Sequence, residues 1–348
     1  MHRHRRLSII LDVPIGLVAI ALLLAAVARP AASAPLGVRV RSFPIPTANS
    51  QPIEIALGAD GNLWFTESGA SRVARITPQG AITEFVTPTA SFPEDITAGP
   101  DGNVWFTEGS IGRIGRITPA GAIREIKFSN FDASEGITAG PDGNIWFTDF
   151  TGNKVWRLDL TTRTLTSFPL PTPNSQPSDI TTGSDGNLWF LEPGVGRLAK
   201  ITPTGVITEF PEPLNIPFAI TSGPDGNIWL TERFNQRIAK VTLTGQFTFF
   251  TTTLHTLESI ITGPDGNLWF TAFGDNTVAN ITVNGVITNV VVLPGSAPTG
   301  ISQGPRGTVW VLGYGTNKVY RLTMRPTFAP LAVGAEGIET LSIETSDA

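Results

Sequence analysis

Acidic side chains recur at equivalent places in a repeated sequence and are the first candidates for chemistry. Glu94, Glu135 and Glu258 each stand just before a short β-branched run such as Ile-Thr-Ala. If the repeats bring them together, their carboxyl groups raise each other's pKa and can bind a basic ligand or a cation. The alternative is three separate, solvated carboxylates. We take them as candidate ligand residues and as weak metal candidates. Mg²⁺ or Ca²⁺ would suit such oxygens, although the sequence requires neither.

Bulky side chains form a second group of candidates, a few residues beyond a recurring tryptophan. Ser68 and Gly109 represent the small residues at such places, whereas other copies carry Phe150, Arg233, Phe273 and Tyr314. Aromatic groups on loops are typical of contact surfaces. We expect these four side chains to line a ligand site.

Histidine chemistry has little support in this chain. The histidines are His2, His4 and His255, and there is no cysteine, which excludes disulfides and thiolate zinc sites. His255 lies in an irregular stretch, 251–258, without a histidine partner. It is a weak candidate for a catalytic base beside Glu258, and the simpler interpretation is an exposed linker histidine.

A repeated module must position all of these residues. The motif Asp-Gly-Asn-Leu-Trp begins at Asp60 and recurs, with a degenerate copy at Arg306, seven times in all at spacings of 40 to 43 residues. Each unit has β-branched and aromatic runs divided by Asp-Gly and Pro-x-Gly turns, which indicates four strands and excludes helices. The sequence predicts an all-β fold, a seven-bladed β-propeller of four-stranded antiparallel blades.

The ends of the repeat region predict how the ring closes. Ser42–Pro52 matches Ser167–Pro177 at nine of eleven positions, and the later copy ends an outer strand and leads into the next blade. Residues near Val38 to Phe43 are therefore expected to complete the blade that begins after Pro298. An exported domain without disulfides would be held together by this exchange of strands.

The domain organisation is indicated by the two ends of the chain. A basic start followed by an apolar stretch makes residues 1–34 a predicted signal peptide, or an anchor if it is not cleaved. Residues 35–325 form the predicted propeller, and 326–348 a tail expected to be poorly ordered. The protein is then secreted or periplasmic, with membrane attachment only if the signal remains.

The net charge of −5 argues against a nucleic-acid partner, and we expect a monomer that binds a small molecule, a glycan or a protein.

The repeated charged residues have structural interpretations. Aspartate before glycine fits a tight turn and lacks the ligand spacing of a calcium loop. In five units an acid stands three positions after the tryptophan and a base eight positions after it, as in Glu67 with Arg72. Both are absent from the sixth unit, and the seventh has Gly313 with Lys318. We expect such residues to form ion pairs within each blade, with a ligand site as the alternative.

Two motifs resemble a known family. Gly-Pro-Asp-Gly-Asn-Ile-Trp-Phe-Thr, and Arg-Ile-Gly-Arg-Ile-Thr-Pro at Arg113–Pro119, are similar to those of the virginiamycin B lyase (streptogramin B lyase) family over residues 38–323. The resemblance implies a seven-bladed propeller. It also implies magnesium-assisted opening of cyclic depsipeptide esters by elimination, although a shared fold is weak evidence for a shared reaction.

This sequence departs from the family at the positions that the resemblance assigns to catalysis. Thr299 stands where the family has its histidine base, Ala297 and Tyr314 where it has two metal-binding glutamates, and Glu258 where it has a substrate-contacting histidine. The sequence therefore favours an exported, non-catalytic binding propeller. The alternatives are a diverged lyase that uses His255, and a divalent-metal hydrolase of the lactonase type that uses the three glutamates.

Overall fold

The computed structural model describes residues 36–109, 112–127 and 134–326. Within this part of the chain, Val38–Arg325 form one compact unit. The predicted signal peptide, residues 1–34, and all but the first residue of the predicted tail, 326–348, lie outside the described residues. The helical structure in the described ranges amounts to the 3-10 turns η1 (Ser68–Ala70), η2 (Phe273–Asp275) and η3 (Pro305–Gly307), and no helix in them is long and apolar enough to cross a membrane.

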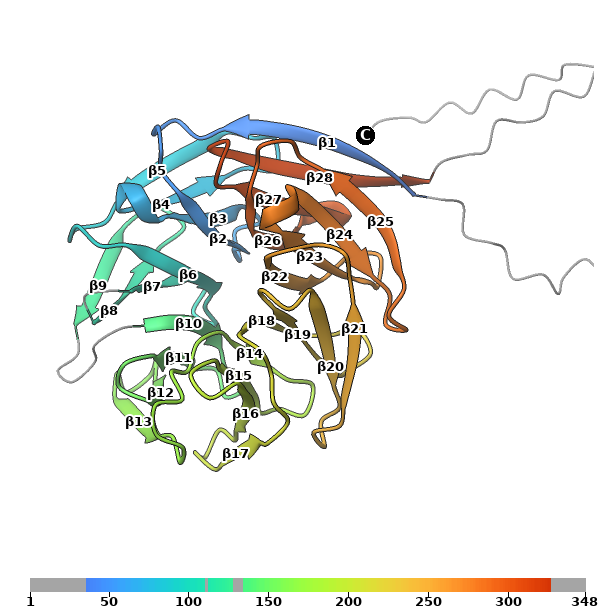
Figure 1. Ribbon diagram of the computed structural model, residues 1–348. Helices are drawn as coiled ribbons and strands as arrows, with labels where there is room; N and C mark the ends of the chain where they lie inside the picture. The colour runs from blue at the N-terminus through green and yellow to red at the C-terminus, as the bar shows by residue number, and fades with distance from the viewer. Residues whose placement is uncertain (1–35, 110–111, 128–133, 327–348) are drawn as a thin grey trace, which may run out of the picture. The chain divides into compact units, whose positions relative to one another are not determined.

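Seven four-stranded antiparallel sheets confirm the predicted propeller (Figure 1). The first three blades run, from inner to outer strand, β2 (Pro52–Leu57), β3 (Leu63–Glu67), β4 (Arg72–Ile76), β5 (Ile82–Val86); β6 (Pro93–Ala98), β7 (Val104–Glu108), β8 (Arg113–Ile117), β9 (Ile123–Lys127); β10 (Ser134–Ala139), β11 (Ile145–Asp149), β12 (Lys154–Leu158), β13 (Leu165–Pro169). The next three run β14 (Ile180–Thr182), β15 (Leu188–Glu192), β16 (Arg197–Ile201), β17 (Ile207–Phe210); β18 (Pro217–Ser222), β19 (Ile228–Glu232), β20 (Arg237–Val241), β21 (Phe247–Thr251); β22 (Leu257–Thr262), β23 (Leu268–Ala272), β24 (Thr277–Ile281), β25 (Ile287–Val292).

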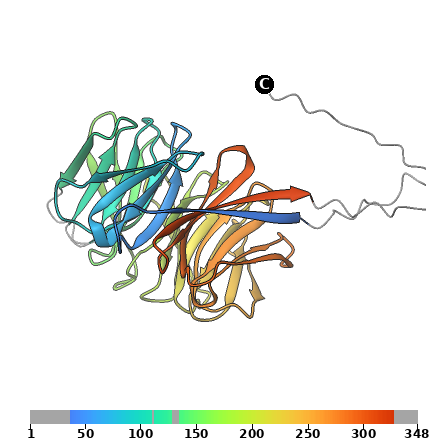
Figure 2. The same ribbon diagram turned by 90° about the horizontal axis from the view of Figure 1, so that it is seen from above.

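The seventh blade joins both ends of the ring, as the duplicated segment predicts. Strands β26 (Pro298–Gly304), β27 (Thr308–Gly313) and β28 (Lys318–Pro326) are completed by β1 (Leu36–Pro44), which lies along β28 (Figures 1 and 2). Beyond the strand, Asn317 accepts hydrogen bonds from the backbone N–H and the hydroxyl of Ser50, both at 2.9 Å. Closure therefore rests on a strand and on side-chain hydrogen bonds rather than on covalent links.

The tryptophan of each second strand builds the core between blades. Trp64, Trp146, Trp189, Trp229, Trp269 and Trp310 are fully buried, and Trp105 is 3% exposed. In five blades an aromatic ring of the outermost strand stacks on the indole at 5.2–5.7 Å between centroids. Such pairs add about 0.5–1.5 kcal/mol beyond the burial of their area.

The Asp-Gly motif is a turn, as predicted. Gly61 has φ 76°, and Asp60 Oδ1 accepts hydrogen bonds from the backbone N–H of Asn62 and from the Trp64 indole N–H, both at 3.1 Å. The same aspartate-to-indole bond recurs in the next five blades at 2.9–3.0 Å. One carboxylate thus closes the turn and satisfies the buried indole.

The predicted ion-pair ladder is mostly wrong. Among the described residues, Glu232 with Arg237 is the one ion pair of that kind. Arg72, Arg113 and Arg197 pair instead with outer-strand Glu84, Glu125 and Glu209 at 2.6–3.4 Å. The partner is decided by the outer strand: the fifth blade has Phe249 in place of that glutamate, and its arginine packs over the ring and turns back to Glu232.

Candidate functional site

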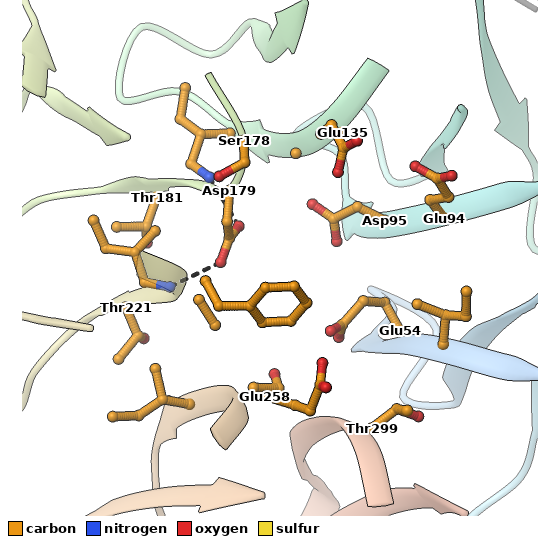
Figure 3. Close-up of a pocket in the computed structure, with 18 of the residues that line it drawn as sticks. Glu54, Glu94, Asp95, Glu135, Ser178, Asp179, Thr181, Thr221, Glu258 and Thr299 are labelled. Carbon is orange, nitrogen blue, oxygen red and sulfur yellow. Dashed lines mark hydrogen bonds between the residues drawn. The ribbon is translucent and has the colours of Figure 1, made fainter. Parts of the chain in front are cut away.

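The beginnings of the inner strands enclose a pocket of about 860 Å³ at the propeller axis (Figure 3). One position from each of the seven blades lines it: Ile53, Glu94, Glu135, Ser178, Phe218, Glu258 and Thr299. The three glutamates singled out in the sequence therefore face one common cavity. These seven equivalent positions could be predicted from the repeat, because each blade places the same position of its inner strand at the axis.

Hydrogen bonds between blades fix where these residues lie. Thr66, in β3, donates through its hydroxyl to the backbone carbonyl of Glu94 at 2.8 Å. The equivalent threonines Thr107 and Thr231 donate to the carbonyls of Glu135 and Glu258 at 3.1 and 2.9 Å. A buried threonine of one blade thus anchors the backbone of each acidic residue in the next.

Three more acids line the pocket, and sequence reasoning missed them. Glu54, Asp95 and Asp179 each come directly after one of those seven positions, next to Ile53, Glu94 and Ser178 respectively. Simple strand alternation would direct neighbouring side chains to opposite faces. The register shifts at this point in the first two blades, between Pro52 and Ile55 and again in β6, which lets both neighbours face the axis. Figure 3 shows carboxyl groups turned towards the centre from Glu54, Asp95, Glu135, Asp179 and Glu258.

Two of the newly found acids also join neighbouring blades. Asp95 accepts hydrogen bonds from the backbone N–H of Ile96 and of Ile137 in the next blade, both at 2.7 Å. Asp179 does the same with Ile180 and Ile220 at 2.8 Å. Burial raises the pKa of Asp179 to about 7, against these hydrogen bonds, and raises that of Asp95 well above its usual range. These two aspartates support the fold as well as the charge of the pocket.

The remaining acids hold protons unusually tightly. Burial, and then the charge of Glu135, raises the pKa of Glu94 to about 7. Burial also raises the pKa of Glu135, and burial followed by the charge of Asp95 raises that of Glu54. Glu258 is 5% exposed, and burial raises its pKa despite the opposing effect of Arg233. At neutral pH the pocket therefore carries carboxyl groups that a nearby positive charge would ionise.

Arg233 is the one cationic side chain among the residues that line this pocket. Its Nη2 lies 2.6 Å from Glu258 Oε1, and its guanidinium group lies 4.2 Å from the centre of the Phe218 ring. The pocket therefore already binds one guanidinium group, that of Arg233, between a carboxylate and an aromatic face.

The other predicted contact residues lie where the sequence suggested. Phe150, Phe273 and Tyr314 line the pocket with Arg233. The rings of Phe273 and Tyr314 are 6.1 Å apart and tilted by 57°. The pocket therefore combines an acidic floor with an aromatic wall.

His255 is not among the residues that line the pocket. It is 59% exposed, and its Nδ1 lies 3.2 Å from Asp275 Oδ1 in the neighbouring η2 turn. Its backbone N–H also donates to Asp275. The structure brings His255 to Asp275 rather than to Glu258.

The residues present do not fit a magnesium site. In the described ranges, no three His, Cys, Asp or Glu side chains are arranged to hold a metal ion, so Glu94, Glu135 and Glu258 do not form one. Ala297 and Tyr314 supply no carboxylate. Thr299, at the position of the implied base, donates its hydroxyl to the Pro52 carbonyl at 3.0 Å. These side chains therefore support no metal-assisted step.

Comparisons with known proteins agree with the motifs. The model of the virginiamycin B lyase family matches residues 31–215 and 211–346. A streptogramin B lyase structure shares 31% identity over 83% of this chain and 98% of its own, with a TM-score of 0.78. The virginiamycin B lyase from Staphylococcus aureus shares 33% over 82% and 99%, with a TM-score of 0.75, and its catalytically inactive variant with quinupristin gives 0.77 at the same identity and coverage. No curated protein sequence matches the chain.

Proposed function

Because this chain belongs to the virginiamycin B lyase family, we propose that it uses the family's propeller as a binding module rather than as an enzyme. The ligand is a small or peptide-borne cation with an apolar portion, held in the acidic pocket at the axis. The observation that supports this most directly is the charge of the lining, which has six carboxyl groups and a single arginine.

The physical argument has two parts. A ligand cation favours the ionised form of carboxyl groups whose pKa values burial has raised, so binding gains Coulomb energy while releasing protons. The aromatic wall accepts the apolar part of the ligand, and a cation over such rings is stabilised further. A volume of about 860 Å³ is in the range of pockets for drug-sized molecules.

The replaced residues argue against inherited catalysis. General base catalysis requires a group that accepts a proton near neutral pH. Thr299 cannot act as such a base, and its hydroxyl proton is committed to the Pro52 carbonyl. The nearest histidine in sequence, His255, faces Asp275 and does not line the pocket.

Isothermal titration with benzyltrimethylammonium tests the binding function. We expect saturable binding that tightens as the pH rises through about 7, where Glu94 ionises, and about tenfold weaker binding in Glu94→Gln and Glu135→Gln. Glu212→Gln, an exposed acid outside the pocket, is the matched control and should bind as the parent does. Absence of binding, or equal binding by all three variants, would refute the proposal.

A diverged lyase is the second candidate, supported by the similarity to streptogramin-opening enzymes. Incubation with quinupristin and Mg²⁺, followed by chromatography, is expected to leave the cyclic compound intact. Appearance of the linear product, lost again in His255→Ala, would overturn the binding-module proposal in favour of this one.

We also propose that the protein acts outside the cytoplasm, after export directed by residues 1–34. Amino-terminal sequencing of protein recovered from the culture medium or periplasm should find a start between about residue 29 and residue 35. Recovery of intact protein starting at Met1 in the membrane fraction would indicate the anchored alternative.

A further inference from the structure

A second groove, of about 350 Å³, lies between the second and third blades, among third-strand and outer-strand residues. Its lining includes Trp105, Ile126 and Leu158 together with Arg116, Arg124 and Arg163. None of these residues lines the axial pocket. Departures from the repeat explain why a cavity opens at this junction.

The first departure removes an aromatic ring. In five blades a phenylalanine of the outermost strand stacks on the tryptophan, as Phe85 does on Trp64 at 5.6 Å. In the second blade Ile126 stands at that place, opposite Ile114 as Phe85 is opposite Val73. The smaller side chain leaves space beside Trp105.

The second departure changes the turn of the next blade. In the first blade, the ring of Phe85 packs directly against a turn glycine of the second blade, Gly121. A β-carbon on Gly121 would be 2.1 Å from the ring. The third blade has Arg163 instead, at φ 59°, in a turn lengthened so that its N–H bonds to Asp159. A non-glycine residue in the left-handed region is uncommon, and here it places a cation at the edge of the groove.

The third departure adds positive charge to a cross-strand pair. Arg116 lies directly opposite Arg124. The equivalent pairs in four other blades are a base opposite a threonine: Arg75 with Thr83, Arg157 with Thr166, Lys200 with Thr208 and Lys240 with Thr248. Like charges opposite each other destabilise a sheet unless something compensates them.

Three acids, Asp101, Glu125 and Asp159, also line the groove, but among them only Asp101 pairs with a member of this arginine pair. Glu125 is paired with Arg113 at 2.6 Å, Asp101 with Arg116 at 3.6 Å, and Asp159 accepts backbone N–H bonds from Thr161 and Thr162 at 2.9 and 2.8 Å. Within the described ranges, neither Arg124 nor Arg163 has a carboxylate partner. Two uncompensated arginines therefore flank an apolar floor, in a protein whose net charge is −5.

We propose that this groove binds a small aromatic anion. The aromatic body fills the space that phenylalanine occupies in other blades, against Trp105, Ile126 and Leu158. The anionic group faces Arg124 and Arg163, whose guanidinium groups suit phosphate, sulfate or carboxylate oxygens. The site is separate from the axial pocket and does not depend on the function proposed for it.

Calorimetric titration at low salt with phenyl phosphate tests this, with inorganic phosphate and benzyl alcohol as the two half-ligands. We expect phenyl phosphate to bind at least about tenfold more tightly than either half. Equal binding of inorganic phosphate, or no binding of phenyl phosphate, would overturn the proposal.

Three variants introduce the residue types that other blades have at these positions, so a loss of binding need not reflect a loss of folding. Arg124→Thr and Arg163→Gly should each weaken phenyl phosphate binding about tenfold, and Ile126→Phe should abolish it by filling the groove. Lys127→Thr removes a cation from the same strand outside the groove and should bind as the parent does. A cooperative melting transition shows that each variant is folded, and unchanged binding by Ile126→Phe would refute the site.

Discussion

The buried glutamates at the end of the second strands should make the propeller less stable as the pH rises. Glu67 is fully buried, and neither of its carboxyl oxygens has a hydrogen-bond partner. Burial, and then the charge of Glu84, raises its pKa to about 8, since Arg72 is engaged by Glu84 at 3.0 Å. Burial and the charge of the outer-strand glutamate also raise the pKa of Glu108 and Glu192 to about 7, although Glu108 accepts a hydrogen bond from the Ser91 hydroxyl at 2.9 Å.

The sign and size of the effect are set by proton linkage. In the unfolded chain Glu67 titrates near its ordinary value of 4.5, whereas in the folded protein it stays protonated to about pH 8. The folded state therefore binds more protons throughout that window, and the free energy of unfolding falls as the pH rises through it. A difference of one proton corresponds to about 1.4 kcal/mol per pH unit, so Glu67 alone accounts for about 2 kcal/mol between pH 5 and pH 7.

Glu67→Gln removes the titration while keeping the shape of the side chain. We expect the variant and the parent to melt together near pH 5, and the variant to melt on the order of 5 °C higher at pH 8. Thermal unfolding followed by circular dichroism from pH 5 to pH 8 measures this. A melting-temperature difference that stays constant over that range would refute the reasoning.

The fifth blade provides a matched control of opposite sign. Glu232 is also fully buried, but hydrogen bonds from Arg237, Asn215 and Asn235 lower its pKa against the effect of burial. Its stabilising contribution is therefore present above about pH 4.5 and is lost as the pH falls. Glu232→Gln should destabilise the protein at pH 7, by on the order of 3 kcal/mol, because Arg237 loses its partner.

Three further predictions concern packing and binding. Deleting residues 38–46 should lower the melting temperature and broaden the transition, because the seventh blade loses its outer strand; a transition as sharp and as late as that of the parent would contradict the closure. Ile126→Phe combined with Arg163→Gly should raise the free energy of unfolding by about 0.5–1.5 kcal/mol, because the ring can then stack on Trp105 beside a glycine turn as in other blades; denaturant unfolding measures this. Phe168→Ala, which removes a ring 5.4 Å from its tryptophan, should cost about 3 kcal/mol in the same assay.

The repeat made the fold predictable, and it also made the first ring of site residues predictable. A side chain at a fixed place in seven blades must occupy seven equivalent places around an axis, which is why Glu94, Glu135 and Glu258 meet in one pocket. Glu54 and Asp95 were missed because a local register shift, which the residue pattern does not display, turns two successive side chains to the same side. Asp179 was missed because it lies just before β14, which begins at Ile180, where strand alternation does not fix the direction of a side chain.

The ion-pair ladder failed for a different physical reason. Charge and spacing within the second and third strands are compatible with a pair such as Glu67 with Arg72. An arginine, however, pairs with whichever carboxylate within reach gives the lowest free energy. Glu84 lies on the next strand, is less buried than Glu67 and also binds Thr47, so pairing there leaves less charge desolvated. Comparison of the outer strands, where Glu84 corresponds to Phe249, was the signal that could have revealed the choice.

Two sets of carboxyl groups titrate in the same range of pH. Because burial raises the pKa values of both sets, ionisation of either set lowers the free energy of unfolding, but ionisation of the axial set also favours a bound cation. Ionisation of Glu94 and Asp179, whose pKa values are about 7, strengthens the field that attracts a cation to the axis. Ionisation of Glu67 over the same range weakens a blade. A ligand that binds the folded state alone adds RT ln(1 + [L]/Kd) to the free energy of unfolding. A bound cation should therefore offset the alkaline loss of stability, and the melting-temperature gain produced by benzyltrimethylammonium should be larger at pH 8 than at pH 5. An equal gain at both pH values would mean that the axial carboxyl groups do not hold the cation.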